Sequence, residues 1–153
     1  MKGIFGISQD PNTKNYILVF RYDYFTSMYC KQCGNKYTYG RCEWCKPCQI
    51  NHLKNNFTKW TSGNNQIDYF IQERQLNTDY NDVLIEWIPY NQFNDIEEIC
   101  KSDFTTALYS AVWRDGILYY DYRNETKWIR KPDQKVILKY ILQNIIDKFL
   151  DEV

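Results

Sequence analysis

Four cysteines in two short motifs are the residues of this chain best suited to chemistry. Cys30 and Cys33 form one Cys-x-x-Cys pair, and Cys45 and Cys48 form a second pair after eleven intervening residues. Zinc takes four soft ligands at the corners of a tetrahedron, and each tight Cys-x-x-Cys turn can point two sulfurs at one ion. The spacing predicts a zinc knuckle, and metal binding would contribute on the order of 10 kcal/mol to its folding.

The remaining candidates around this block leave alternatives open. Cys42 could replace Cys45 as a ligand, and His52 is a possible ligand, although a single His at the start of a polar helix is more often solvated. Gly34 and Gly40 lie in the connection, where a knuckle needs positive φ. Six cysteines could also form three disulfides, or remain free thiols, but the N-terminus shows no apolar segment typical of a secretion signal. Paired spacing without such a signal favours metal.

The composition limits the classes of partner. Hydrophobic residues make up 44% of the chain and aromatic residues 18%, enough for a folded core. Lys plus Arg and Asp plus Glu both total 19, so no net positive charge favours a nucleic acid, and we expect none as partner. No run approaches the roughly 18 apolar residues of a membrane span. We expect a cytoplasmic protein that does not bind membranes.

The elements around the cysteine block are predicted from periodicity and turn residues. Residues 3–7 and 16–20 read as two strands around the turn at 10–15, which predicts a β-hairpin. Two helices should follow, joined at 61–64, where one ends and the next is capped. Their apolar residues are Ile50, Leu53, Phe57 and Trp60 in the first, and Ile67, Phe70, Ile71 and Leu76 in the second.

The last third of the chain predicts strands. An antiparallel meander is expected over 107–113, 117–120 and 128–130, with a turn at 114–116. The run that follows has two interpretations. It is either a buried strand that ends at Lys139, or part of one long amphipathic helix that starts after Pro132.

Several short motifs follow one another along residues 30–153: Trp44–Cys48, Trp60–Asn64, Ile67-Asp68, Phe70–Gln72, Gln75-Leu76, Glu86–Tyr90, Ser110–Trp113, Asp115-Gly116 and Val136–Lys139. In this order they resemble a large, expanded fungal family of tyrosine-kinase-like protein kinases. In that family a short module ending in Trp-Cys-x-x-Cys precedes a helical linker and the kinase N-lobe.

The resemblance implies a nucleotide site but no catalysis. Lys139 matches the strand Lys that anchors the phosphates of Mg-ATP, and Glu152 matches its helix Glu partner. The counterpart of the Gly-rich loop, Cys100–Leu108, contains no Gly and carries Asp103, which disfavours phosphate binding. Nothing in the sequence corresponds to the catalytic-loop Asp or the Mg²⁺-binding Asp, so we expect no catalytic residue and no kinase activity by this chain alone.

The first residues add a further likeness. Phe5–Phe20 resembles strands four and five of the same family, which normally follow the helix Glu. Either the chain joins parts of two N-lobes, or it is a permuted lobe. The second hypothesis predicts that Tyr16–Phe20 pairs with Val136–Tyr140.

These observations predict an α+β protein in three parts. They are a β-hairpin over 1–24, a Cys-rich zinc knuckle with a helical hairpin over 25–80, and a partial kinase N-lobe, an antiparallel sheet plus one helix, over 81–153. The function we expect is that of an inactive, truncated kinase-family protein that binds nucleotide weakly or binds a protein partner. The alternative is a zinc-binding interaction adaptor without nucleotide binding.

Overall fold

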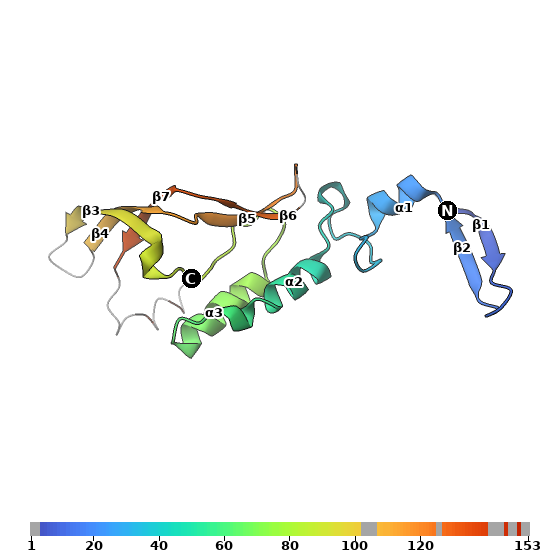
Figure 1. Cartoon of the computed structure of the whole chain (residues 1–153), viewed down its shortest axis with the longest axis horizontal. Coiled ribbons are helices and arrows are strands. Elements are labelled where there is room, and N and C mark those ends of the chain that lie inside the picture. The colour runs from blue at the N-terminus through green and yellow to red at the C-terminus, as the bar shows by residue number, and fades with distance from the viewer. Residues whose placement is uncertain (1–3, 102–106, 125–126, 141–145, 147–149, 151–153) are drawn as a thin grey trace.

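The computed structural model describes residues 4–101, 107–124, 127–140, 146 and 150 (Figure 1). Within them the chain is an α+β fold with three α-helices and small antiparallel sheets, which confirms the predicted class. None of the described helices has the length and apolar character needed to cross a membrane.

The N-terminal segment forms the predicted β-hairpin. Strand β1 (Ile4–Gln9) pairs antiparallel with β2 (Tyr16–Phe20). The Asp10 carboxylate accepts hydrogen bonds from the backbone N–H groups of Asn12, at 2.8 Å, and Thr13, at 3.2 Å, and so fixes the turn. A short helix, α1 (Tyr22–Met28), follows. In Figure 1 this hairpin lies at one end of the molecule, beyond α1.

The predicted pairing of Tyr16–Phe20 with Val136–Tyr140 is wrong. β2 pairs with its neighbour β1, whereas β7 (Gln134–Lys139) pairs with β4 (Ala107–Trp113). Figure 1 shows β2 and β7 at opposite ends of the molecule. A local turn closes at a lower entropic cost than a contact across most of the chain, which favours the hairpin that forms.

Both predicted helices are present, but the first ends at Lys54, so that Phe57 lies in a 3₁₀ turn and Trp60 beyond it. Helix α2 (Lys46–Lys54) is followed by a 3₁₀ turn, η2 (Phe57–Lys59), and by α3 (Asn65–Leu76). Asn64 is the N-cap of α3, and its side-chain oxygen accepts hydrogen bonds from the N–H groups of Gln66, at 2.8 Å, and Ile67, at 3.4 Å. Leu53 and Ile71 are the buried apolar residues of the pair.

The strands of the last third differ from the predicted meander. The chain does not reverse at 114–116. Instead β4 continues into β5 (Ile117–Asp121), the chain reverses after Asp121, and β6 (Lys127–Lys131) returns into β7. The pairing Trp113↔Gln134 between β4 and β7 is followed by Ile117↔Lys131 between β5 and β6. The result is one long, bent hairpin.

The bend has a backbone cause. Gly116 on one arm and Asp133 on the other have positive φ values of 66° and 54°. The N–H of Asp133 donates to the carbonyl of Arg114 at 3.1 Å, so both arms change direction together. The residues predicted to turn the chain therefore bend it without reversing it. At the actual reversal, the Asp121 carboxylate accepts from the N–H groups of Arg123 and Asn124.

One strand was not predicted. β3 (Phe93–Lys101) pairs with the outer edge of β4, giving the sheet order β3-β4-β7. Exposed residues fill 94–100, and acidic side chains interrupt the apolar pattern that would have revealed the strand. Over 134–139 the chain is a strand, so the single-helix alternative is wrong there, while Glu152 lies outside the described residues.

The core joins the Cys-rich segment to the sheet. Trp44, with no exposed surface, packs edge-on against Tyr120 of β5 at 4.7 Å between ring centroids. Trp128 of β6 completes the group at 5.9 Å from Trp44. The indole N–H of Trp128 donates to the side-chain oxygen of Gln49 on α2 at 3.0 Å. These contacts fix the position of α2 relative to the β5–β6 hairpin.

Candidate metal centre

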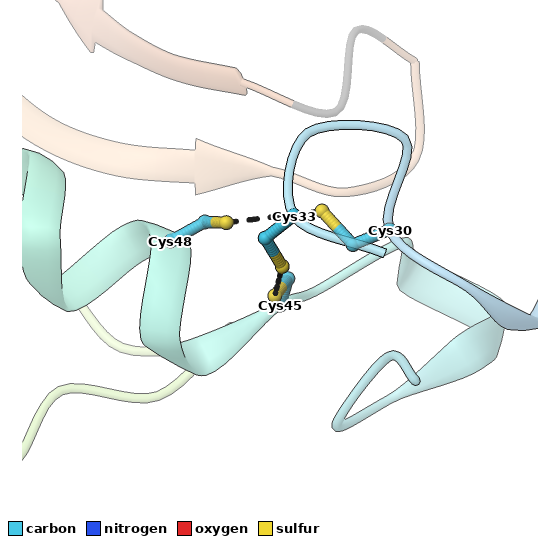
Figure 2. A group of neighbouring side chains, drawn as sticks. All are labelled: Cys30, Cys33, Cys45 and Cys48. Atoms are coloured by element: carbon cyan, nitrogen blue, oxygen red, sulfur yellow. Dashed lines mark hydrogen bonds between the residues drawn. The ribbon is translucent and has the colours of Figure 1, made fainter. Parts of the chain in front are cut away.

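The four predicted cysteine ligands meet at one point (Figure 2). All four sulfur atoms lie within 4.8 Å of one another. The Sγ atoms of Cys30 and Cys48 are 3.8 Å apart, and those of Cys33 and Cys45 are 3.5 Å apart. Each of these short distances joins the first motif to the second. The cluster therefore ties two segments together and does not form within either one.

The first pair lies on a tight turn. The N–H of Cys30 donates to the carbonyl of Asn35 at 2.7 Å, and the N–H of Gly34 donates to the carbonyl of Cys30 at 2.8 Å. Gly34 has φ +72°, as predicted for a knuckle. A β-bridge between Tyr29 and Lys36 closes the base of the turn. The backbone thus points both sulfurs to the same side.

The second pair lies at the start of α2. Cys45 is the N-cap of this helix and Cys48 lies in its first turn, with Pro47 at the N-terminal position that proline prefers. The free N–H groups and the dipole of a helix N-terminus favour negative charge, which offsets part of the cost of burying these two sulfurs as thiolates. A bridge between Tyr39 and Trp44 holds the segment that enters the helix.

The cluster is covered on one side. Cys45 and Cys30 are 1% and 7% exposed, and Tyr37 packs on them. Cys48 is half-buried and Cys33 is exposed. The site therefore has a dry interior and one ligand that faces solvent, the side from which an ion would enter and leave.

The thiols differ in how readily they ionise. A hydrogen bond from the backbone N–H of Asn35, assisted by the Cys48 thiol, lowers the pKa of Cys33 to about 7. Burial raises the pKa of Cys45 and of Cys48. Buried thiolates without a cation are unfavourable, whereas a divalent ion compensates their charge.

The geometry fits zinc. A tetrahedral ion with Zn–S bonds of about 2.3 Å places its ligands roughly 3.8 Å apart, close to the two shortest sulfur pairs. All six cysteines are free, so the disulfide alternative is not what the structure contains. Four thiols, two of them buried, with no other metal-ligating side chain in the described cluster, are compatible with a zinc site.

The positions of the side chains decide between the alternative ligands that the sequence left open. Cys42 is buried against Trp44 and Tyr120 and lies outside the sulfur cluster, so Cys45 is the clustered residue. His52 is exposed on α2 and does not join the cluster. The expectation of positive φ at Gly40 is wrong. Glu43, with φ 49°, takes the left-handed conformation after the 3₁₀ turn η1 (Gly40–Cys42).

The predicted nucleotide residues lie elsewhere. Lys139 is exposed at the end of β7 and pairs with Leu108 of β4. Cys100, at the start of the predicted loop, is exposed on β3. Residues 102–106 of that loop lie outside the described residues, and so does Glu152, the predicted partner of Lys139. The pairing of Lys139 with Glu152 therefore stays a prediction.

Two residues that the sequence analysis did not assign to the site contribute to it. Tyr37 covers Cys30 and Cys45, and Trp44 anchors the second pair to the sheet. Both are aromatic residues between the two Cys-x-x-Cys motifs, and Trp44 directly precedes Cys45, which was the available signal. No protein-family model, curated protein or solved structure matches the chain.

Proposed function

We propose that this chain is a zinc-binding interaction protein, in which one structural ion, held by Cys30, Cys33, Cys45 and Cys48, organises surfaces for a partner. The observation that carries this proposal is the convergence of four sulfurs within 4.8 Å from two separate segments. Four protein ligands complete a tetrahedral shell and leave no position for water or substrate. A closed shell supports a structural role.

The packing around the site supports the same role. The first pair lies on a turn, and α2 buries only Leu53 among its nine residues. Such short elements gain little from burial by themselves. A zinc ion that joins the turn to the helix would supply the missing free energy and fix the surface of α2.

The N-terminal hairpin supports a protein partner. Both of its faces expose large apolar side chains: Ile7 is 69% and Tyr16 78% exposed on one face, and Ile17 is 47% and Val19 41% exposed on the other. A two-stranded hairpin is marginal in water without further packing. Contiguous exposed apolar groups of this kind mark interaction surfaces in soluble proteins.

Chelation tests the zinc role. Removal of zinc with a strong chelator should change the fluorescence of Trp44 and reduce far-UV ellipticity, because the turn and α2 lose their link. Cys45→Ser should reproduce the change, whereas Cys100→Ser, which alters an exposed thiol on β3, should not. Unchanged spectra after complete chelation would contradict the proposal.

A second candidate function is weak nucleotide binding. It is favoured by the order β3-β4-β7, because Lys139 pairs with Leu108, two positions after the segment that connects β3 to β4. In the kinase-like arrangement, a strand Lys beside such a connection faces the phosphates. The exposed ammonium of Lys139 is available for that role.

Thermal denaturation tests the second candidate. Mg-ATP should raise the Tm of the wild type and not of Lys139→Ala, because a ligand stabilises the state that it binds. Lys135→Ala, an exposed position on the same strand, is the matched control and should retain the shift. If Mg-ATP does not raise the Tm of the wild type, or raises the Tm of Lys139→Ala and Lys135→Ala equally, Lys139 has no role in nucleotide binding.

A further inference from the structure

The charge of this chain is distributed unevenly. Between Asp23 and Asp68 there are six cationic side chains and a single acidic one, Glu43. From 68 to 101 the imbalance is reversed, with eight acidic side chains and two cationic ones, and for this reason the whole chain is neutral. The cationic residues are Lys31, Lys36, Arg41, Lys46, Lys54 and Lys59.

These six cations have no ion-pair partner among the residues that the structure describes. Five are exposed and Lys46 is half-buried. A zinc ion with four thiolates carries a net negative charge smaller than this cationic excess, so the segment stays positive when zinc is bound.

Helix α2 presents two recesses. On one side, Lys46 and Lys54 flank a shallow recess of about 520 Å³ that also includes Asn51. On the other side lies a recess of about 380 Å³ that adjoins Cys48 and is lined by side-chain amides, one imidazole, two aromatic rings and an ammonium. The amides are those of Gln32, Gln49, Asn51 and Asn55. Asn51 borders both recesses.

A cationic recess beside an amide-lined one suits a polynucleotide ligand. Ammonium groups bind phosphates, and side-chain amides pair with base edges. In the amide recess, Gln49 is already oriented, because its oxygen accepts from the indole N–H of Trp128 and its amide nitrogen remains to donate. A lipid surface would use the cations but would leave the amide recess without a role.

We propose that α2 and its two recesses bind single-stranded nucleic acid, with phosphates at Lys46 and Lys54 and bases in the amide recess. The neutral total charge does not oppose this, because screening limits charge interactions to about 8–10 Å and makes the local excess decisive. The inference goes beyond the structural zinc site and depends on it only for the position of α2.

The test is fluorescence anisotropy with labelled single-stranded RNA and DNA of mixed sequence, on protein whose zinc content is checked by native mass spectrometry. We expect the logarithm of the binding constant to fall linearly with the logarithm of the salt concentration. Lys46→Gln/Lys54→Gln should weaken binding about tenfold and lower the slope by about 0.7 for each lost phosphate contact. Lys131→Gln/Lys135→Gln, both exposed in the sheet, should leave affinity unchanged.

Further arms separate the rivals. Asn51→Ala should reduce affinity with an unchanged salt slope, because it contacts a base rather than a phosphate. The proposal is overturned if zinc-loaded protein does not bind the labelled strands, or if the two double-lysine variants lose equal affinity. It is also overturned if the protein binds phosphatidylserine vesicles or polyglutamate more tightly than nucleic acid. If no zinc is found but binding and its variant pattern persist, the zinc role fails and the nucleic-acid surface stands.

Discussion

Trp44 and Tyr120 pack edge to face, with ring centroids 4.7 Å apart and ring planes at 81°. Trp44 directly precedes the ligand Cys45, whereas Tyr120 belongs to β5, so this contact couples the metal centre to the sheet. Burial raises the pKa of Tyr120 to about 12, which keeps its hydroxyl neutral in this core. We expect folding of the Cys-rich segment and of the β5–β6 hairpin to be interdependent.

Replacement of Trp44 tests this coupling. Trp44→Ala should lower the free energy of unfolding by about 3–5 kcal/mol, because a large buried ring leaves a cavity. Trp44→Phe should cost less than about 2 kcal/mol, since it keeps an aromatic ring and removes an indole N–H that has no hydrogen-bond partner among the described residues. Trp87→Ala, at a position 38% exposed, is the control for urea denaturation. Equal losses for Trp44→Ala and Trp87→Ala would contradict the coupling.

The bend of the long hairpin predicts an unequal effect of two glycine substitutions. Gly116→Ala would place its Cβ 1.7 Å from the carbonyl oxygen of Lys131 at φ +66°, and should cost roughly 3 kcal/mol. Gly63→Ala has a similar φ of +82° but open space around the new methyl, and should cost only about 1 kcal/mol. Thermal and urea unfolding measure both. Similar losses of stability in the two variants would contradict the close approach of the two arms at Gly116.

The cap before α3 predicts a pH dependence. Hydrogen bonds from the hydroxyls of Ser62 and Thr61 and from the N–H of Ser62 lower the pKa of the Asp68 carboxyl. A carboxyl whose folded pKa lies below its unfolded value stabilises the fold above the unfolded pKa. That contribution is lost as the pH falls through the folded pKa. We expect wild type and Asp68→Asn to differ in stability near neutral pH and to converge below about pH 4.

Carboxyl NMR titration checks this directly. The Asp68 signal should titrate below the usual range for aspartate. A constant difference in stability between wild type and Asp68→Asn across the whole acid range would show that the cap contributes nothing through its charge.

Most of the cysteine cluster could be predicted from sequence, because the paired Cys-x-x-Cys spacing brings the sulfurs together. The turn residue Gly34 and the Pro47 at the helix start were local signals for the same site. The packing of Trp44 on Tyr120 and Trp128 was not predictable, since a long-range contact depends on the register of strands that the sequence does not specify. Only the structure could assign Cys42 to that core and Cys45 to the cluster.

The strands, too, could be predicted only in part from the sequence. Strands with a continuous apolar run, such as β2 and β4, were found from composition. β3 was missed because it is exposed and rich in acidic residues, and it forms through pairing with β4. The turn at 114–116 was misassigned because Gly and Asp favour positive φ in both a reversal and a bend, and the partner at Asp133 decides between them.

The most direct measurement is native mass spectrometry of the wild type, Cys45→Ser and Cys42→Ser after refolding with excess zinc. The four-sulfur geometry predicts one zinc ion in the wild type, loss of that ion in Cys45→Ser, and its retention in Cys42→Ser, whose thiol packs in the aromatic core. A wild type without zinc, or a site that survives Cys45→Ser and is lost in Cys42→Ser, would contradict the account.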